Sequence, residues 1–304
     1  MFKEQQQYYN TLRYEVQEPE TLKRLLKGRL NFSENALYKL KKNGRVSVNG
    51  VISPFGSKIY KGDLVKIDLS EDPSEFAPQN LDVTVIYEDF DVLVVNKPPY
   101  MVVHPTKGHV SGTLANGITY LQNAKNEPIH VRFINRLDMN TSGLVMVAKN
   151  TFAHQQIGLD MTKDMVRKKY LALVHGVVIC DSGIIDAPIY RNTEESIKSI
   201  VDERGQASVT KYSVLRRYKS ATLLEVELLT GRTHQIRVHL AHIGHGIIGD
   251  ELYGHADATL INRQALHAYY LAFNQPRTKE RIELTIDLPE DMQMLIDRLA
   301  LEQV

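Results

Sequence analysis

A charged segment between two apolar runs constrains the fold of this chain more than any other feature. The segment contains Arg136 and Asp138. It separates the mostly apolar runs Val131–Ile134 and Leu144–Ala148, which have the length of buried strands. A buried carboxylate is costly unless it is paired or hydrogen-bonded. We therefore expect Asp138 at a strand–loop junction, with a cationic partner from the arginine-bearing segment Thr230–His239.

Length and composition set broad limits. A chain of 304 residues suits one large and one small domain, or two of medium size, and 43% hydrophobic with 24% charged residues is ordinary for a globular protein. The single cysteine, Cys180, excludes an intrachain disulfide and a Cys-rich zinc module. Met1–Glu20 is too polar for a signal peptide, and no 18-residue apolar run exists. We expect a cytoplasmic protein without a membrane segment.

Positive charge is concentrated near the start of the chain. Residues 21–66 contain 11 Lys and Arg against 2 Asp and Glu, a local excess of 9, whereas the whole chain carries +1. A basic module beside a mildly acidic body is typical of an RNA-binding appendage. A solvated charged face is the alternative interpretation.

The basic stretch has the pattern of two helices and a small sheet. Apolar spacing predicts helices over Thr21–Lys27 and over Ser33–Lys42, which opens on a capping serine. Arg45–Gly50 alternates like a strand and ends in an Asn-Gly turn, and Lys58–Leu69 predicts a further strand pair. Glu71–Asn80, with two prolines and three acids, is a predicted linker.

The remaining chain is rich in predicted strands, with interspersed helices. Helices are expected from Thr113, over Gln235–Ile243 and over Met292–Leu301. Strands and helices do not alternate strictly, so the pattern predicts an α+β body with a mixed, largely antiparallel central sheet. The expected strands are Val83–Tyr87, Asp91–Asn96, Gly143–Lys149, Tyr170–His175, Val209–Arg216 and Thr222–Leu229.

Asn135–Gly143 resembles the HRLDxxTSG motif of the RluA-type pseudouridine synthases, especially the RluD-like group that carries an S4 RNA-binding domain. Asn135 stands where the family has His, and Met139-Asn140 where Lys-Asp is frequent. In the basic stretch, Gly44–Gly50 resembles the GxVxVNG turn of S4 domains, although Glu34 stands where many have Arg. The other matched segments, in family order, are Val92–Pro99 with His104-Pro105, Lys168–Tyr170, Gly231–His239, Gly249–Gly254 and Arg263–Ala268.

The resemblance implies a two-domain enzyme that isomerises specific uridines of structured RNA to pseudouridine. An S4-like, small α/β RNA-binding domain with an N-terminal extension would span residues 1–75, and a pseudouridine synthase catalytic domain residues 76–304. The implied substrate is large-subunit ribosomal RNA, and a monomer is expected. The alternatives are a transfer-RNA pseudouridine synthase and a non-catalytic RNA-binding or ribosome-assembly factor.

The family match implies catalytic roles for Asp138, Tyr170 and Arg237. The reaction breaks the N1–C1′ bond, turns the base and joins C5 to C1′, which needs no redox change and no external nucleophile, so no cofactor is expected. Asp138 would attack C1′ or remove the C2′ proton. Arg237 would keep it ionised, and Tyr170 would stack on the uracil and handle a proton locally.

Substrate contacts are implied for Arg136, Arg232, His234 and Ile236. Arg136 would fill the gap left by an extruded uridine, since extrusion costs on the order of a few kcal/mol. Arg232 would hold the RNA backbone, and Ile236 would pack against the base.

Two other kinds of site are alternatives to this interpretation. A sugar-active hydrolase would need a second carboxylate near Asp138. Four histidines, His234, His239, His242 and His245, have near-helical spacing, but no carboxylate or cysteine completes a familiar metal site, so no metal is expected.

Overall fold

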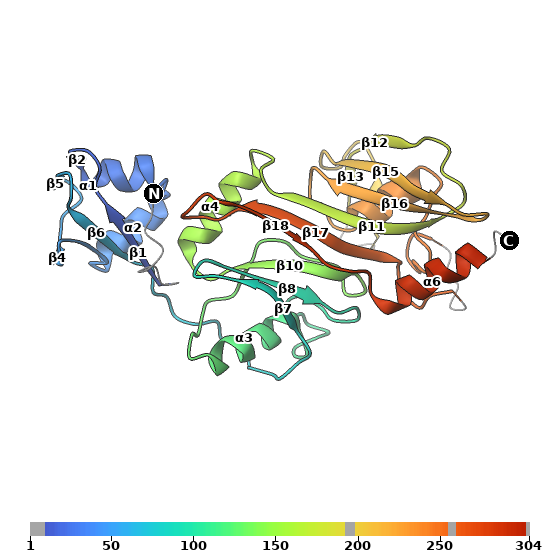
Figure 1. The fold of residues 1–304 in the computed structure, drawn as a ribbon, viewed down its shortest axis with the longest axis horizontal. Coiled ribbons are helices and arrows are strands. Elements are labelled where there is room, and N and C mark those ends of the chain that lie inside the picture. Colours follow the sequence, from blue (N-terminus) through green and yellow to red (C-terminus); the bar gives the residue numbers. More distant parts are fainter. Residues whose placement is uncertain (1–9, 192–197, 255–259, 302–304) are drawn as a thin grey trace.

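The computed structural model describes residues 10–191, 198–254 and 260–301. It shows a small N-terminal part at one end of an elongated molecule and a larger body built around one broad sheet (Figure 1). The α+β class and the mixed, mainly antiparallel sheet are as predicted. In the described ranges no helix combines the length and apolar character needed to cross a bilayer.

The N-terminal part packs short helices against a four-stranded antiparallel sheet of order β1-β6-β3-β4. The predicted capping serine, Ser33, accepts a hydrogen bond from the Ala36 amide. Asn49 and Gly50 both have positive φ, as a tight hairpin turn requires. The elements are β1 (Thr11–Glu15), β2 (Glu20–Thr21), α1 (Leu22–Arg24), the π-helical turn η2 (Leu25–Arg29), α2 (Glu34–Lys42), β3 (Val46–Val48), β4 (Val51–Ile52), β5 (Lys58–Ile59) and β6 (Leu64–Asp68).

The body is built on a ten-stranded sheet with the main order β12-β15-β16-β11-β17-β10-β8-β7, to which β18 and β9 add. In the described ranges its neighbours are antiparallel except for β10 and β17, which run parallel over a two-residue register. The strands are β7 (Thr84–Glu88), β8 (Val92–Lys97), β9 (Arg132–Phe133), β10 (Ser142–Ala148), β11 (Arg167–His175), β12 (Ser182–Asp186), β15 (Val209–Arg217), β16 (Ala221–Leu228), β17 (Leu266–Asn274) and β18 (Arg281–Thr285). A separate pair joins β13 (Ile189–Tyr190) and β14 (Ile200–Val201).

Helices cover both faces of the sheet, which explains why β8 and β10 are apolar without alternation. Val145 and Val147 pack into a core that includes Leu114 of α3, whereas Leu144 and Met146 pack into a second core that includes Ile157 of α4. The helices of the body are α3 (Leu114–Ala124), α4 (Thr151–Met161), α5 (Gln235–His242) and α6 (Glu290–Leu301).

The N-terminal part rests on the body through specific contacts at β1 and α4. Phe32 packs on Phe152 of α4, with ring centroids 5.3 Å apart. Arg277 pairs with Asp91, both fully buried, and donates a hydrogen bond to the Thr11 carbonyl of β1 at 2.6 Å. These contacts give the N-terminal part a defined orientation relative to the body.

Gly143, at the start of β10, sits where no side chain fits. Its φ is +121°, and a Cβ atom would lie 2.3 Å from the Ala268 carbonyl oxygen of β17. We expect Gly143→Ala to lower the free energy of unfolding by at least about 2 kcal/mol, measured by urea titration. The control is Gly158→Ala in α4, where no atom lies within 4 Å of the added methyl. It should be neutral or slightly stabilising, and equal losses in both variants would contradict the expectation.

Candidate active site

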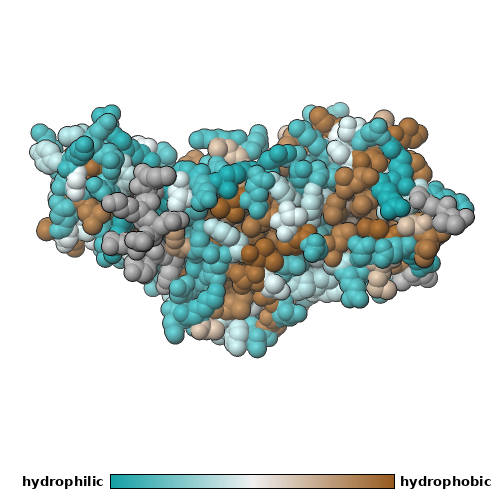
Figure 2. All heavy atoms as spheres, in the orientation of Figure 1, coloured by the Kyte–Doolittle hydropathy of each residue, from teal (hydrophilic) through white to brown (hydrophobic). Residues whose placement is uncertain are grey.

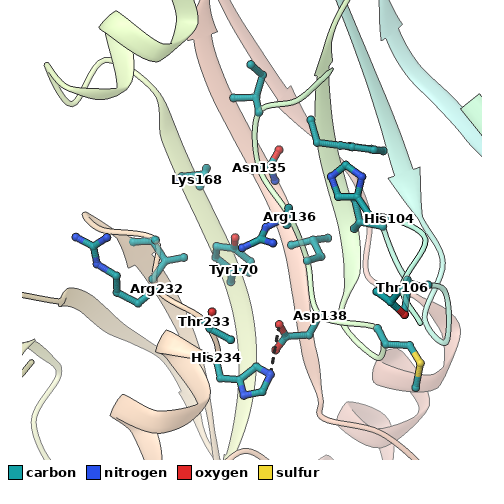
Figure 3. A pocket seen from close by; sticks show the side chains of 18 of the residues that line it. His104, Thr106, Asn135, Arg136, Asp138, Lys168, Tyr170, Arg232, Thr233 and His234 are labelled. Carbon is teal, nitrogen blue, oxygen red and sulfur yellow. Dashed lines mark ion pairs between the residues drawn. The ribbon is translucent and has the colours of Figure 1, made fainter. Parts of the chain in front are cut away.

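The predicted functional residues meet at one pocket of about 450 Å³ beside the entry to β10 (Figure 3). Arg136, Asp138, Tyr170, Arg232 and His234 all line it. A smaller adjoining pocket of about 60 Å³ adds the two remaining predicted residues, Ile236 and Arg237, and shares Asp138 and Tyr170. The fold thus brings together all seven candidate residues from segments up to about 100 positions apart.

Asp138 lies in the loop between β9 and β10, and its side chain is 28% exposed. The Arg237 Nη1 atom donates to Asp138 Oδ2 at 3.0 Å. The carboxylate is therefore open to the pocket on one side and held by a guanidinium on the other. This is the cationic partner that the sequence led us to expect.

Arg237 also holds a second carboxylate, which sequence reasoning missed. Its Nε and Nη2 atoms donate to the two oxygens of Asp250 at 2.7 and 2.8 Å. Asp250 is fully buried and also accepts the amides of Leu252 and Tyr253. Burial alone would lower the pKa of Arg237, but the bonds and charges of Asp250 and Asp138 raise it. Asp250 thus orients the guanidinium that faces Asp138.

The loop that follows Asp138 is held residue by residue by side chains of the body. Because each anchor is buried, the loop has little freedom to move the carboxylate. The bonds are Lys97 Nζ to the Met139 carbonyl (2.9 Å), Arg263 Nη1 to the Asn140 carbonyl (3.2 Å), Gln264 Nε2 to Thr141 Oγ1 (3.2 Å), and Ser142 Oγ with His267 Nδ1 (2.9 Å).

Lys97 is fully buried and donates to three backbone carbonyls, those of Pro98, Met101 and Met139. Burial and the charge of Arg263 lower its pKa to about 7, although Asp138 opposes the shift. In the unfolded chain a lysine has a pKa of about 10.4. The folded state therefore binds fewer protons between these values, so this group destabilises the fold below pH 7 and the penalty disappears as pH rises toward 10.

We accordingly expect the free energy of unfolding to rise between pH 7 and pH 9, by at most about 3 kcal/mol from this group, since each pKa unit corresponds to about 1.4 kcal/mol. The three carbonyl acceptors favour the ammonium form and reduce the effect. Urea titrations of the wild type and Lys97→Met at both pH values measure it. A pH dependence that is the same in both proteins would contradict the assignment.

Tyr170 reaches the pocket from β11, opposite an irregularity in the pairing with β17. β17 advances three residues, from His267 to Tyr270, while β11 advances two. Such a bulge re-aims the local side chains. Tyr170 is 5% exposed, and burial together with the charge of Asp138 raises its pKa. Its hydroxyl therefore stays protonated at neutral pH.

Among the described residues that line it, the pocket carries more positive than negative charge. Four cationic side chains line it, Arg136, Lys168, Arg191 and Arg232, whereas Asp138 is the one carboxylate among its described lining residues. Figure 3 shows Arg136, Lys168 and Arg232 around Tyr170. Such a surface attracts a polyanion. The hydrolase alternative is not supported by this lining, since Asp250 is buried behind Arg237 and does not line the pocket.

Three of the four histidines proposed as possible metal ligands have protein partners. His239 is buried, with its ring nitrogens bonded to Thr210 Oγ1 and the Ala187 carbonyl. His245 Nδ1 is bonded to the His175 carbonyl. His234, just before α5, has a left-handed backbone (φ +57°) and places its Nε2 atom 3.9 Å from Asp138 Oδ1.

Comparisons with known proteins show which family this chain resembles over the segments that form the pocket. The family model described as RNA pseudouridylate synthase matches residues 91–242, a range that contains Asp138, Tyr170 and Arg237. The RNA pseudouridine synthase YlyB of Bacillus subtilis is 44% identical over 263 residues, covering 85% of this chain and 86% of the relative. Ribosomal large subunit pseudouridine synthase D of Pasteurella multocida is 36% identical over 269 residues, covering 84% and 83%.

Solved structures show the same fold. Human RNA pseudouridylate synthase domain containing 1 has a TM-score of 0.57 at 26% identity and covers 76% of this chain and 98% of its own. Human RNA pseudouridylate synthase domain containing 4 has a TM-score of 0.58 at 24% identity, covering 71% and 93%.

Proposed function

Because this chain belongs to the RNA pseudouridylate synthase family, we propose that the uridines it isomerises lie in large-subunit ribosomal RNA. The enzyme is a pseudouridine synthase, an isomerase. One observation supports the substrate class: relatives at 36% and 37% identity carry the name ribosomal large subunit pseudouridine synthase D. The cationic pocket suits the phosphate backbone of RNA in general.

Asp138 is the proposed catalytic group, and its place as the one carboxylate among the described lining residues of the pocket carries this assignment. The N1–C1′ bond breaks, the base turns, C5 bonds to C1′, and finally C5 loses its proton while N1 gains one. An ionised carboxylate serves as nucleophile at C1′ or as base at C2′. Arg237, 3.0 Å away, stabilises the ionised form.

The remaining site residues are proposed to bind and hold the flipped nucleotide. Tyr170 and Ile236 are largely buried at the adjoining small pocket and offer apolar faces to a uracil ring. Arg136 is exposed at the pocket and is long enough to fill the gap left in the RNA stack. Arg232, exposed on the turn before α5, would contact phosphate.

We further propose that residues 1–75 form an S4-like RNA-binding domain and residues 76–304 the catalytic domain. The first part has two helical segments and a small sheet, and its charge is strongly positive over residues 21–66. Figure 2 shows that it is mainly hydrophilic on the face in view, whereas apolar areas of that face lie over the body. Binding through phosphates would weaken steeply with salt.

Pseudouridine mapping in cells tests the substrate. Total RNA from cells lacking the protein, complemented with wild type or Asp138→Ala, is labelled with carbodiimide and reverse-transcribed. We expect stops in large-subunit ribosomal RNA that vanish without the protein and return only with the wild type. If the stops that depend on the wild-type protein lie in transfer RNA instead, the transfer-RNA alternative would be correct and the ribosomal proposal wrong.

A further inference from the structure

A hydrogen-bond chain behind the pocket determines which nitrogen of His234 carries the proton. The Ser199 amide donates to the Tyr253 hydroxyl at 2.6 Å, and this hydroxyl lies 2.9 Å from His234 Nδ1. Tyr253 has one hydroxyl proton, and its oxygen already accepts from Ser199. The arrangement that also uses this proton in a hydrogen bond directs it to Nδ1, which then acts as the acceptor. A neutral imidazole in this arrangement carries its own proton on Nε2.

The Nε2–H group faces Asp138 without bonding to it. The separation from Nε2 to Oδ1 is 3.9 Å, longer than a hydrogen bond. Burial lowers the pKa of His234 while the charge of Asp138 opposes this, so the ring is neutral at physiological pH. An oxygen atom about 2.8 Å from both groups fits a gap of this width. That oxygen must accept from Nε2–H and donate to the carboxylate, which a hydroxyl group does.

The ribose supplies a hydroxyl at this place. Asp138 acts at C1′ or at C2′, and the 2′-hydroxyl is bonded to C2′, so either route brings it beside the carboxylate. We propose that His234 Nε2–H and Asp138 together bind the 2′-hydroxyl of the target uridine, and that Tyr253 is the positioning residue that holds His234 in the required tautomer. This inference rests on the proposed function. It makes the pair a determinant of specificity for RNA over DNA.

The tautomer is measured first, on the full-length protein without RNA. Nitrogen-15 chemical shifts of histidine side chains distinguish Nε2–H from Nδ1–H rings, and the His234 signal is identified by its absence in His234→Ala. We expect Nε2–H in the wild type and a mixture of tautomers in Tyr253→Phe, which lacks the hydroxyl. An Nδ1–H ring in the wild type would overturn the proposed donor.

The contact itself is tested by a double-substitution cycle. The wild type and His234→Ala each act, in single turnover, on an RNA fragment with either uridine or 2′-deoxyuridine at the mapped target. In the wild type the deoxy substitution should cost about 10- to 100-fold in rate, the range of a hydrogen bond to a charged group. In His234→Ala the same substitution should cost several-fold less, because one of the two bonds is already missing.

Two further variants sharpen this cycle. His234→Gln, which retains an N–H donor, should recover part of the discrimination. The matched control is His242→Ala on the exposed end of α5, which should discriminate as the wild type does. Equal deoxy costs in wild type and His234→Ala would overturn the contact. A wild type that modifies neither RNA would instead contradict the proposed function. The tautomer measurement needs no RNA, so it tests the hydrogen-bond chain independently of that outcome.

Discussion

Asp138→Asn is expected to reduce pseudouridine formation by at least about 10³-fold, because an amide serves neither as nucleophile at C1′ nor as base at C2′. The fold should persist, since the side chain is partly exposed and Arg237 keeps its two bonds to Asp250. Release of tritium from RNA containing [5-³H]uridine measures the reaction, because C5 loses its hydrogen when it bonds to C1′.

The control for this prediction is Asp186→Asn, an exposed carboxylate of β12 that does not line the pocket. It should release tritium at the wild-type rate. RNA binding by Asp138→Asn should be equal to or tighter than that of the wild type, since a negative charge is removed from a cationic pocket. Tritium release by Asp138→Asn within ten-fold of the wild type would show that another group performs the chemistry.

Arg237→Met is expected to lower the free energy of unfolding by about 3–5 kcal/mol and to abolish activity. The loss of stability arises because Asp250 stays buried while its bidentate partner is removed. The loss of activity arises because Asp138 no longer faces a guanidinium. Urea titration followed by circular dichroism suits this chain, which contains no tryptophan.

A second substitution separates the two effects of Arg237. In Arg237→Met combined with Asp250→Leu, both buried charges are replaced by apolar groups of similar size, so much of the stability should return. Activity should not return, because the cation beside Asp138 is still absent. Recovery of activity together with stability would mean that Arg237 matters only for folding. If Arg237→Met alone were as stable as the wild type, the stabilising role of the buried Arg237–Asp250 ion pair would be contradicted.

Local signals in the sequence predicted much of the fold. The helix over Ser33–Lys42 follows from its capping serine and apolar spacing, and β10 and β16 follow from apolar or β-branched runs bounded by polar residues. A contact such as that between Asp138 and Arg237 was predictable, because a partly buried carboxylate is costly unless it is paired or hydrogen-bonded. The order and pairing of the strands depend on contacts distant in sequence, which no local pattern specifies.

The features that were missed depend on tertiary structure. β17 was not predicted as a strand, because apolar and polar residues do not alternate along its nine positions. Its start does fall in the segment Arg263–Ala268, which resembles the family. α4 was missed because its buried face includes the polar Gln156, which bonds to the Leu30 carbonyl of the N-terminal part. Asp250 and Tyr253 lie in the segment Gly249–Gly254, which resembles the family. Their roles depend on contacts with Arg237 and His234 that the sequence does not show.

The most direct test of the account uses purified wild-type protein, Asp138→Asn and unmodified large-subunit ribosomal RNA made by transcription. After incubation, the RNA is digested to nucleosides and pseudouridine is quantified by chromatography, with a transfer-RNA transcript as the parallel substrate. The account predicts pseudouridine in the ribosomal RNA with the wild type only. Pseudouridine formed equally by Asp138→Asn, or by the wild type in transfer RNA alone, would contradict it.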